Sequence, residues 1–330
     1  MPMSIGDRLH ELDSSQQKTR GLRFVAAVIK KFSDDQGTQL AALIAYYGFV
    51  SLFPLLLVFV TILGFILQGD HAEQQKILNG ALGQFPIVSS TLKPQSLKGS
   101  PTALAIGLIG ALLAGLGIMS ATQTAFDRIW AVPFKHRPNF IFARLRSLAM
   151  LALLGTLSIV STVIGGFVGT GSYSTLELVL SVVLAFIGNF VLFMLAFKVL
   201  TAAEVEWRDL VPGAITAALF WQLLQHLGGY YVDHVLKRTQ PLYGVFAVVL
   251  GLLAWLYLGA QMTVIAAEVN VVKTRRLWPR SFFNDPLLEA DRRALTHSAE
   301  SEERIPAEDV QVSFDETSAD TPAGPSGQSG

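Results

Sequence analysis

Hydrogen-bonding side chains interrupt several long apolar stretches of this chain, and these are the residue types that could do chemistry. The candidates share a place near the middle of such a stretch, together with a helix-breaking proline: Tyr47, Ser51, Pro54, Asn189, Gln222, Gln225, His226, Tyr257 and Gln261. Amide, imidazole and hydroxyl groups at that depth can bind a polar solute, and they can equally join one helix to its neighbour. We expect a cavity lined by these residues, and packing between helices is the alternative.

A second set of polar residues lies near the ends of the same stretches: Gln39, Asp127, Arg128, Arg208, Glu268 and Asn270. Charged groups at a helix end reach water at modest cost. We therefore expect a charged and polar network there, in which Glu268 pairs with Arg128 or Arg208 as a structural clamp. A proton relay is the alternative.

The sequence lacks the patterns of common enzyme sites. It has no cysteine, which excludes thiolate catalysis and cysteine-ligated metals. Its six histidines form no His-Glu-x-x-His motif, and no Gly-x-Ser-x-Gly turn is present. Its basic residues are not interleaved with aromatic ones, as they would be on a nucleic-acid surface. We expect no enzyme activity, no metal, no cofactor and no nucleic-acid partner.

These side chains need elements that hold them, and six apolar stretches supply such elements: about 41–67, 102–125, 147–169, 176–198, 211–230 and 243–270. The first stretch has 27 positions without a charged side chain, and about 20 apolar residues suffice to cross a bilayer as a helix. Only 15% of all residues are charged. The sequence predicts an all-α protein with one six-helix membrane domain over residues 36–275.

Lysine and arginine are unevenly distributed between the connections. If the N-terminus is inside, 20 of the 25 basic residues lie in inside segments. Cytoplasmic loops carry such an excess, so both termini are predicted to be cytoplasmic.

The second stretch is rich in small residues, and Gly110, Gly117, Ser120 and Thr124 share one helical face. Small residues allow the backbones of membrane helices to approach closely. We expect this face to pack against another helix, and a pore is the alternative.

The two ends of the chain differ from the membrane domain. Residues 1–35 form a predicted cytoplasmic arm, in which Leu22, Val25, Ile29 and Phe32 recur at helical spacing. This amphipathic helix either lies at the lipid headgroups or packs on the bundle. Residues 276–330 are predicted to be a disordered cytoplasmic tail, since residues 281–330 hold eleven acidic against three basic residues.

Several motifs occur in the order known from one family: Ala41-Ala42, Tyr46-Tyr47, Ser51-Leu52-Phe53-Pro54, Arg128-Ile129-Trp130, Val205-Glu206-Trp207-Arg208, Pro212-Gly213-Ala214, Tyr243-Gly244, Trp255-Leu256-Tyr257 and Ala267-Glu268-Val269-Asn270. Over residues 20–275 the chain resembles the YihY/BrkB family of bacterial inner-membrane proteins, formerly labelled ribonuclease BN-like. Two positions depart from the family pattern: Phe126-Asp127 replaces Leu-Asn, and Ala266 replaces Gly. Asp127 thus adds a charge at a helix end where the family pattern has a neutral amide.

The resemblance implies six spans and a location in the bacterial inner membrane. It implies no established activity, although the family is associated with moving lipid or envelope components. The leading hypothesis is therefore a transporter or flippase-like protein, with the lipid bilayer and a lipid or small-molecule substrate as partners. A scaffold that organises envelope machinery is the alternative, and a membrane-associated ribonuclease is a third. The sequence sets no oligomeric state.

Overall fold

The computed structural model describes residues 20–66, 101–168, 175–231, 245–281 and 287–314, and the regular elements in these ranges are all helical. In chain order they are α2 (Arg20–Asp34), α3 (Gly37–Ile66), α6 (Pro101–Ile129), the short 3-10 helix η1 (Phe134–His136), α7 (Phe140–Val168), α8 (Thr175–Leu200), α9 (Trp207–Tyr231), α11 (Val245–Thr274) and α12 (Glu289–Glu300). The all-α prediction is confirmed for the described residues.

Five of the described helices are long and apolar enough to cross a membrane. The qualifying segments are Gly37–Leu55, Ala105–Ile129, Leu180–Leu200, Trp207–Gly228 and Val249–Thr274. They coincide with the first, second, fourth, fifth and sixth predicted stretches. The third predicted stretch, 147–169, lies on the 29-residue helix α7, which is not among the five. The sixth span therefore stays a prediction, as does the orientation of the termini.

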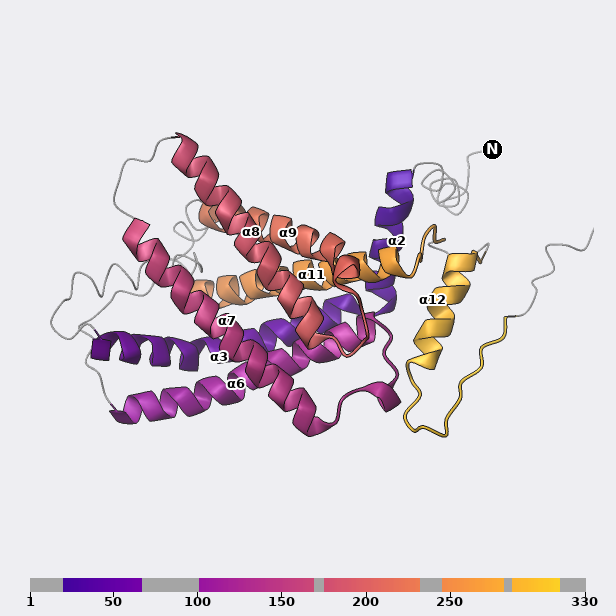
Figure 1. The fold of residues 1–330 in the computed structure, drawn as a ribbon, viewed down its shortest axis with the longest axis horizontal. Helices are drawn as coiled ribbons and strands as arrows, with labels where there is room; N and C mark the ends of the chain where they lie inside the picture. The colour runs from indigo at the N-terminus through magenta and orange to yellow at the C-terminus, as the bar shows by residue number, and fades with distance from the viewer. Residues whose placement is uncertain (1–19, 67–100, 169–174, 232–244, 282–286, 315–330) are drawn as a thin grey trace, which may run out of the picture.

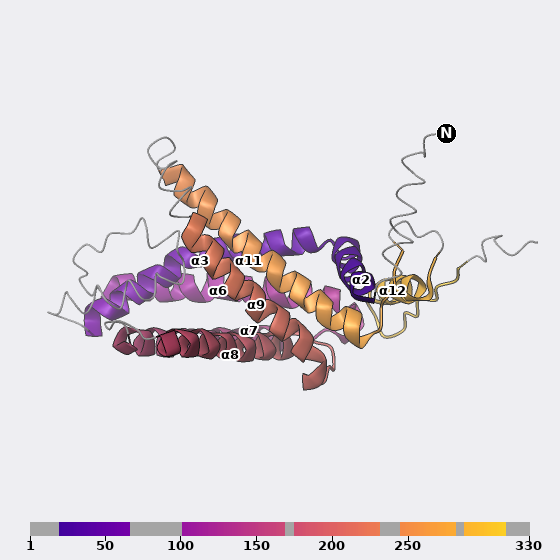
Figure 2. The same cartoon turned by 90° about the horizontal axis from the view of Figure 1, so that it is seen from above.

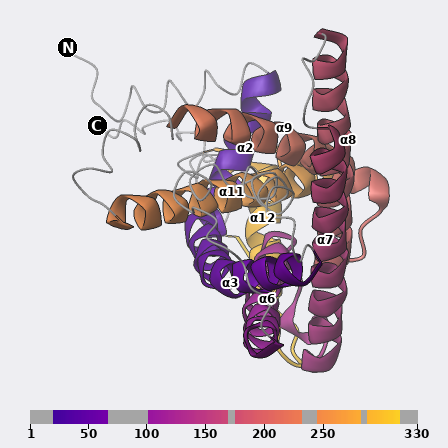
Figure 3. The same cartoon turned by 90° about the vertical axis from the view of Figure 1, so that its left-hand side faces the viewer.

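The long helices run lengthwise and converge at one end (Figure 1). Helices α3 and α6 lie side by side, and α11 packs against both α3 and α9. Helices α7 and α8 form a layer below α3 and α6 in Figure 2 and on the right in Figure 3, and α9 joins α8 to α11.

Glycines allow α6 to approach α3 closely. A Cβ added at Gly117 would lie 2.6 Å from the ring of Tyr47, and one at Gly110 would lie 3.0 Å from Pro54. Real Cβ atoms are not found at the first of these distances, so these glycines admit the side chains of α3. The predicted small-residue face is therefore a packing face. Pro54 contacts α6 there, which places the proline of α3 at a helix interface.

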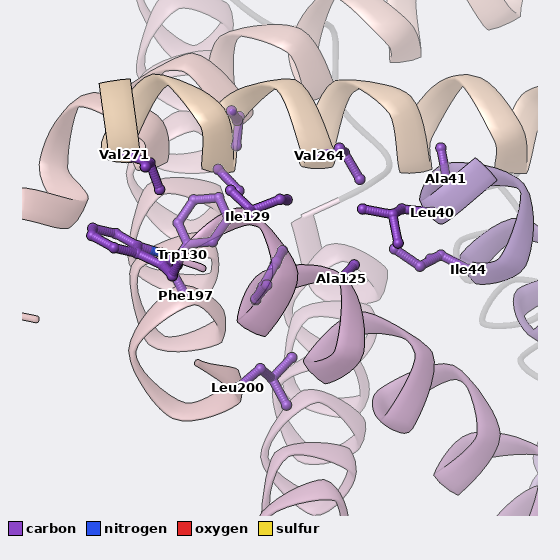
Figure 4. Packing of buried hydrophobic residues seen from close by; sticks show 14 of the residues in the cluster. Leu40, Ala41, Ile44, Ala125, Ile129, Trp130, Phe197, Leu200, Val264 and Val271 are labelled. Carbon is purple, nitrogen blue, oxygen red and sulfur yellow. The ribbon is translucent and has the colours of Figure 1, made fainter. Parts of the chain in front are cut away.

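The largest apolar core lies where the helices converge. Figure 4 shows Ile129 and Trp130 at the end of α6 between Val264 and Val271 of α11 and Phe197 of α8. The Phe126 and Phe197 rings meet at a centroid distance of 5.2 Å. This core fixes the ends of α6, α8 and α11, and therefore the polar groups around them.

Two shorter helices lie at this end of the bundle. Helix α2 crosses it steeply to α3, and α12 lies beyond α2 (Figure 1). The prediction of a disordered tail over 276–330 is wrong for residues 287–314, which contain α12 and bury Ala290, Asp291 and Ala294. The acidic composition of the whole tail concealed this short apolar face. Residues 315–330 lie outside the described part of the chain.

Candidate functional site

Seven charged residues meet at the convergent end of the bundle, from α2 and the residue after it, from α11, from position 280 and from α12. They form what we call the charge network: Lys30, Lys31, Asp34, Asp35, Glu268, Arg280 and Asp291. All except Asp34 are buried. Buried charges must be paired to avoid a large desolvation cost. The network therefore imposes a specific arrangement on the elements that carry it.

Lys31 joins α2 to two other helices. Its Nζ pairs with Asp35 one turn along α2, and it lies 3.6 Å from Glu268 Oε2 on α11. It also donates a hydrogen bond of 3.1 Å to the carbonyl oxygen of Ile129, at the end of α6. The last carbonyls of a helix have no partner within the helix and carry its negative dipole end. A lysine is therefore a suitable cap, and the guanidinium of Arg275 binds the next carbonyl, that of Trp130, at 2.5 Å.

Asp291 of α12 anchors the C-terminal segment. Its Oδ1 accepts a hydrogen bond of 2.8 Å from Arg280 Nε and lies 3.5 Å from Lys30 Nζ. Its Oδ2 accepts a hydrogen bond of 3.0 Å from the backbone N–H of Ser281. Arg280 also pairs with Asp34 at 2.8 Å. Helices α2 and α12 are thus joined directly by the buried pair of Lys30 and Asp291, and through Arg280 by the pair with the exposed Asp34.

The chain after α12 crosses the loop between α6 and α7. Lys135 pairs with Glu303 at 2.8 Å, and its Nζ donates to the carbonyl of Glu308 at 3.1 Å. The backbone N–H of Lys135 donates to the carbonyl of Glu303 at 3.0 Å. The described C-terminal segment, 287–314, therefore contacts both α2 and the α6–α7 loop.

Acidification is expected to loosen this segment. Burial and the nearby Arg275 lower the pKa of His297, and the hydrogen bond from Lys135 lowers the pKa of Glu303. A group whose pKa is lower in the folded state takes up protons on unfolding, so stability falls as the pH falls. For His297 the loss begins as the pH falls through its ordinary value of about 6.5, and for Glu303 it continues near about 4.3. Hydrogen exchange of residues 287–314, corrected for the intrinsic rate, should lose protection from pH 7 to pH 5.

The control for that experiment is His297→Gln, which removes the upper titration. In this variant the protection of residues 287–314 should stay constant as the pH falls, until carboxylates begin to be protonated. Equal pH dependence in the two proteins would contradict the assignment to His297.

The predicted network at the helix ends is brought together only in part. Glu268 is fully buried, but its partner is Lys31, so the predicted pairing with Arg128 or Arg208 is wrong. Arg208 pairs instead with Glu206 at the surface. Arg128 and Gln39 are exposed. Several cations were predicted at the same membrane depth as Glu268, and their positions along the chain could not show which of them pairs with it.

Asn270 and Asp127 have separate structural roles. Asn270 Oδ1 accepts a hydrogen bond of 2.6 Å from the backbone N–H of Gly213, where α9 crosses α11. Asp127 Oδ1 accepts one of 2.8 Å from the backbone N–H of Ala202, after α8. The asparagine of the family pattern could accept the same hydrogen bond through its side-chain oxygen. The replacement by Asp127 therefore keeps the acceptor.

The candidate cavity residues of α9 lie toward α8 and the outer surface. Gln222 Nε2 is 3.4 Å from the carbonyl of Val182 on α8, and His226 Nδ1 is 2.7 Å from the carbonyl of Gln222. His226 is exposed, and Gln225 Oε1 is buried without a hydrogen-bond partner among the described residues. Asn189, on α8, is half-buried.

The other candidates lie in the packing of α3 and α11. Gln261 Nε2 donates to the hydroxyl of Tyr257 at 3.0 Å, and Ser51 Oγ donates to the carbonyl of Gly48 at 2.8 Å. Tyr47 and Tyr257 pack against the core. The candidate residues therefore form two separate groups: the α9 residues and the Tyr257–Gln261 pair on α11.

Sequence reasoning placed only Glu268 of the seven residues of the charge network at a polar network. The six missed residues are Lys30, Lys31, Asp34, Asp35, Arg280 and Asp291. A local signal existed, because lysines at 30 and 31 precede aspartates at 34 and 35 at the i,i+4 spacing of helical ion pairs. No local signal joined them to residues 280 and 291.

Comparison with known proteins gives one family and a set of relatives. The family model described as "Virulence factor BrkB" matches residues 28–281. The inner membrane protein YhjD of Escherichia coli (strain K12) is 24% identical over 80% of this chain and 85% of its own length. A UPF0761 membrane protein of Janthinobacterium sp. (strain Marseille) is 28% identical over 65% of this chain.

The chain spans only 53% of the Janthinobacterium protein and 60% of the UPF0761 membrane protein Smlt0865 of Stenotrophomonas maltophilia (strain K279a), which is 27% identical. No solved structure matches the chain.

Proposed function

Since the chain belongs to the BrkB family of integral membrane proteins, we propose that it is a transporter or flippase-like protein that moves a lipid or another envelope component across the bacterial inner membrane. In this proposal α7 supplies a sixth span, and both termini are cytoplasmic. The substrate path runs along the polar side chains of α9 and includes Asn189 of the neighbouring helix α8. Tyr257 and Gln261 form a second polar group on α11.

The observation that supports the proposal is the position of the α9 polar groups. Gln222, Gln225 and His226 lie on a helix that is long and apolar enough to span, and His226 is exposed. Polar residues placed only to join helices should be packed between them, since a polar group facing hydrocarbon carries a desolvation cost. The exposed imidazole of His226, on the same helix as the half-buried amides of Gln222 and Gln225, fits a path that a polar headgroup or solute uses.

The test is a scrambling or uptake assay with the purified full chain in liposomes. Fluorescent phospholipids with quenching of the outer leaflet report lipid movement, and loaded vesicles report uptake of small solutes. We expect Gln222→Leu combined with His226→Leu to reduce the rate at least tenfold, because both polar contacts on the path are removed. Gln261→Leu should also slow transport if the second group belongs to the path.

The matched control is Leu219→Ile, an apolar exchange at an exposed position on the same helix. It should leave the rate within about twofold, since volume and polarity are kept. Unchanged rates in both the double variant and Gln261→Leu would show that these residues are not the path. No transport by the unaltered chain for any lipid or solute tested would count against the transporter itself.

A scaffold is the second candidate, and the folded segment 287–314 favours it. A folded segment held on the bundle by buried ion pairs offers a fixed surface to other proteins. Truncation after residue 314 keeps this segment, whereas truncation after residue 281 removes Asp291. The scaffold is favoured if truncation after residue 281 abolishes the cellular phenotype and truncation after residue 314 does not. In both proteins the bundle should be inserted and transport should persist.

A further inference from the structure

Helix α2 has its charged and apolar faces reversed with respect to a helix in water. Lys30 and Lys31 point inward and are only 6% and 5% exposed, because they bind the acids of the charge network. Leu22, Val25 and Ile29 are 54%, 53% and 54% exposed. These three apolar residues are separated by three, four and seven positions, so they form one continuous strip along the helix.

The opposite side of α2 is packed on protein. Phe24, Ala27 and Val28 contact Val269 and Val272 of α11 in a small apolar cluster. The strip is therefore not the face that docks α2 on the bundle. Since Leu22, Val25 and Ile29 are each more than half exposed, no element among the described residues covers this strip.

The depth of α2 follows from its two neighbours. Its contacts on α11 lie within the final turns of the candidate span Val249–Thr274. The next candidate span, on α3, begins at Gly37, three positions after α2 ends at Asp34. Helix α2 also runs across the end of the bundle, steeply to α3 (Figure 1). A helix placed in this way lies in the plane of the membrane surface, at the ends of the spans.

We infer that the strip of Leu22, Val25 and Ile29 is an interaction surface for lipid, inserted at the boundary between the headgroups and acyl chains. A lipid contact explains both the exposure of the apolar strip and the burial of Lys30 and Lys31. Apolar side chains gain by leaving water for the acyl region, and the lysines gain by leaving that region for buried acids. The inference rests on the membrane location of the chain and is independent of the proposed transport.

The experiment uses the absence of cysteine from the chain. Single variants Leu22→Cys, Val25→Cys and Ile29→Cys carry a nitroxide spin label in full-length protein, reconstituted in vesicles of phosphatidylethanolamine and phosphatidylglycerol. Oxygen concentrates in the bilayer and a nickel chelate stays in water, so the ratio of their collision rates reports the medium around each label. References are Leu184→Cys, exposed on the span α8, and Ser298→Cys, exposed on α12.

We expect the three α2 labels to favour oxygen over nickel several-fold, as the label at 184 does and the label at 298 does not. A nickel preference at all three positions would show a strip in water and overturn the inference. Low collision with both reagents would also overturn it. Spectral broadening that disappears on dilution with unlabelled protein would then identify a second copy of this chain as the cover, and its absence would identify another part of the same chain.

Discussion

Gly213→Ala is expected to separate α9 from α11 and to destabilise the bundle severely. A Cβ at position 213 would lie 2.3 Å from the carbonyl oxygen of Ala266 and 2.4 Å from Asn270 Nδ2. The first of these atoms belongs to the backbone of α11, so no side-chain rotation relieves the overlap. The helices must move apart, and the 2.6 Å hydrogen bond from the N–H of Gly213 to Asn270 is then lost.

The expected loss is on the order of 3 kcal/mol or more, from overpacking together with an unsatisfied buried hydrogen-bonding group. Thermal unfolding in detergent, followed by size-exclusion chromatography with fluorescence detection, measures it. Gly188→Ala is the matched control, because it lies on α8 with nothing within 4 Å of its added Cβ. If Gly188→Ala lowered the thermal stability as much as Gly213→Ala does, the close approach of α9 and α11 would not explain the effect.

Arg280→Met is expected to release the C-terminal segment from the bundle. The substitution keeps an apolar stem but removes the closer of the two cations that pair with the fully buried Asp291, leaving only Lys30 Nζ at 3.5 Å. Breaking a buried ion pair from one side costs about 3–5 kcal/mol, since the other charge stays desolvated. Hydrogen exchange and limited proteolysis should therefore show residues 287–314 opening, while the membrane helices keep their protection.

The control is Arg208→Met, which breaks a pair with Glu206 of similar length, 2.7 Å, but with both side chains largely exposed. Surface ion pairs contribute about 0–1 kcal/mol, so this variant should behave almost as the unaltered chain does. Restoring protection with Asp291→Asn in the Arg280→Met background would confirm that the buried charge of Asp291, left without its guanidinium, is the cause. Equal effects from the two arginine variants would rule out burial as the deciding factor.

The helical architecture could be predicted from the sequence because bilayer-length apolar stretches leave few alternatives. Five of the six stretches coincide with span-length helices, and the small-residue face of α6 packs as expected. The surroundings of the polar residues could not be predicted in the same way. Helical spacing places Gln222 and His226 on one stripe of α9 but does not say whether that stripe faces α8 or α11.

The C-terminal segment shows a different limit. Net acidic composition predicted disorder for the tail, yet one aspartate within it, Asp291, finds an arginine and a lysine in a buried place. Average charge carries no information about a single well-placed partner. Ala290 and Ala294, one helical turn apart, were the local trace of the fold, and two alanines do not stand out in an acidic tail.

The charge network also constrains the order in which the molecule can be completed. Lys30 and Lys31 leave the ribosome well before Glu268, Arg280 and Asp291 do. Until those residues have been made, the two lysines have none of these distant partners. Their burial can follow only after the last membrane helix and α12 have been made. Closure of this end of the bundle is a late event in biogenesis, and a chain stalled before residue 291 cannot reach it.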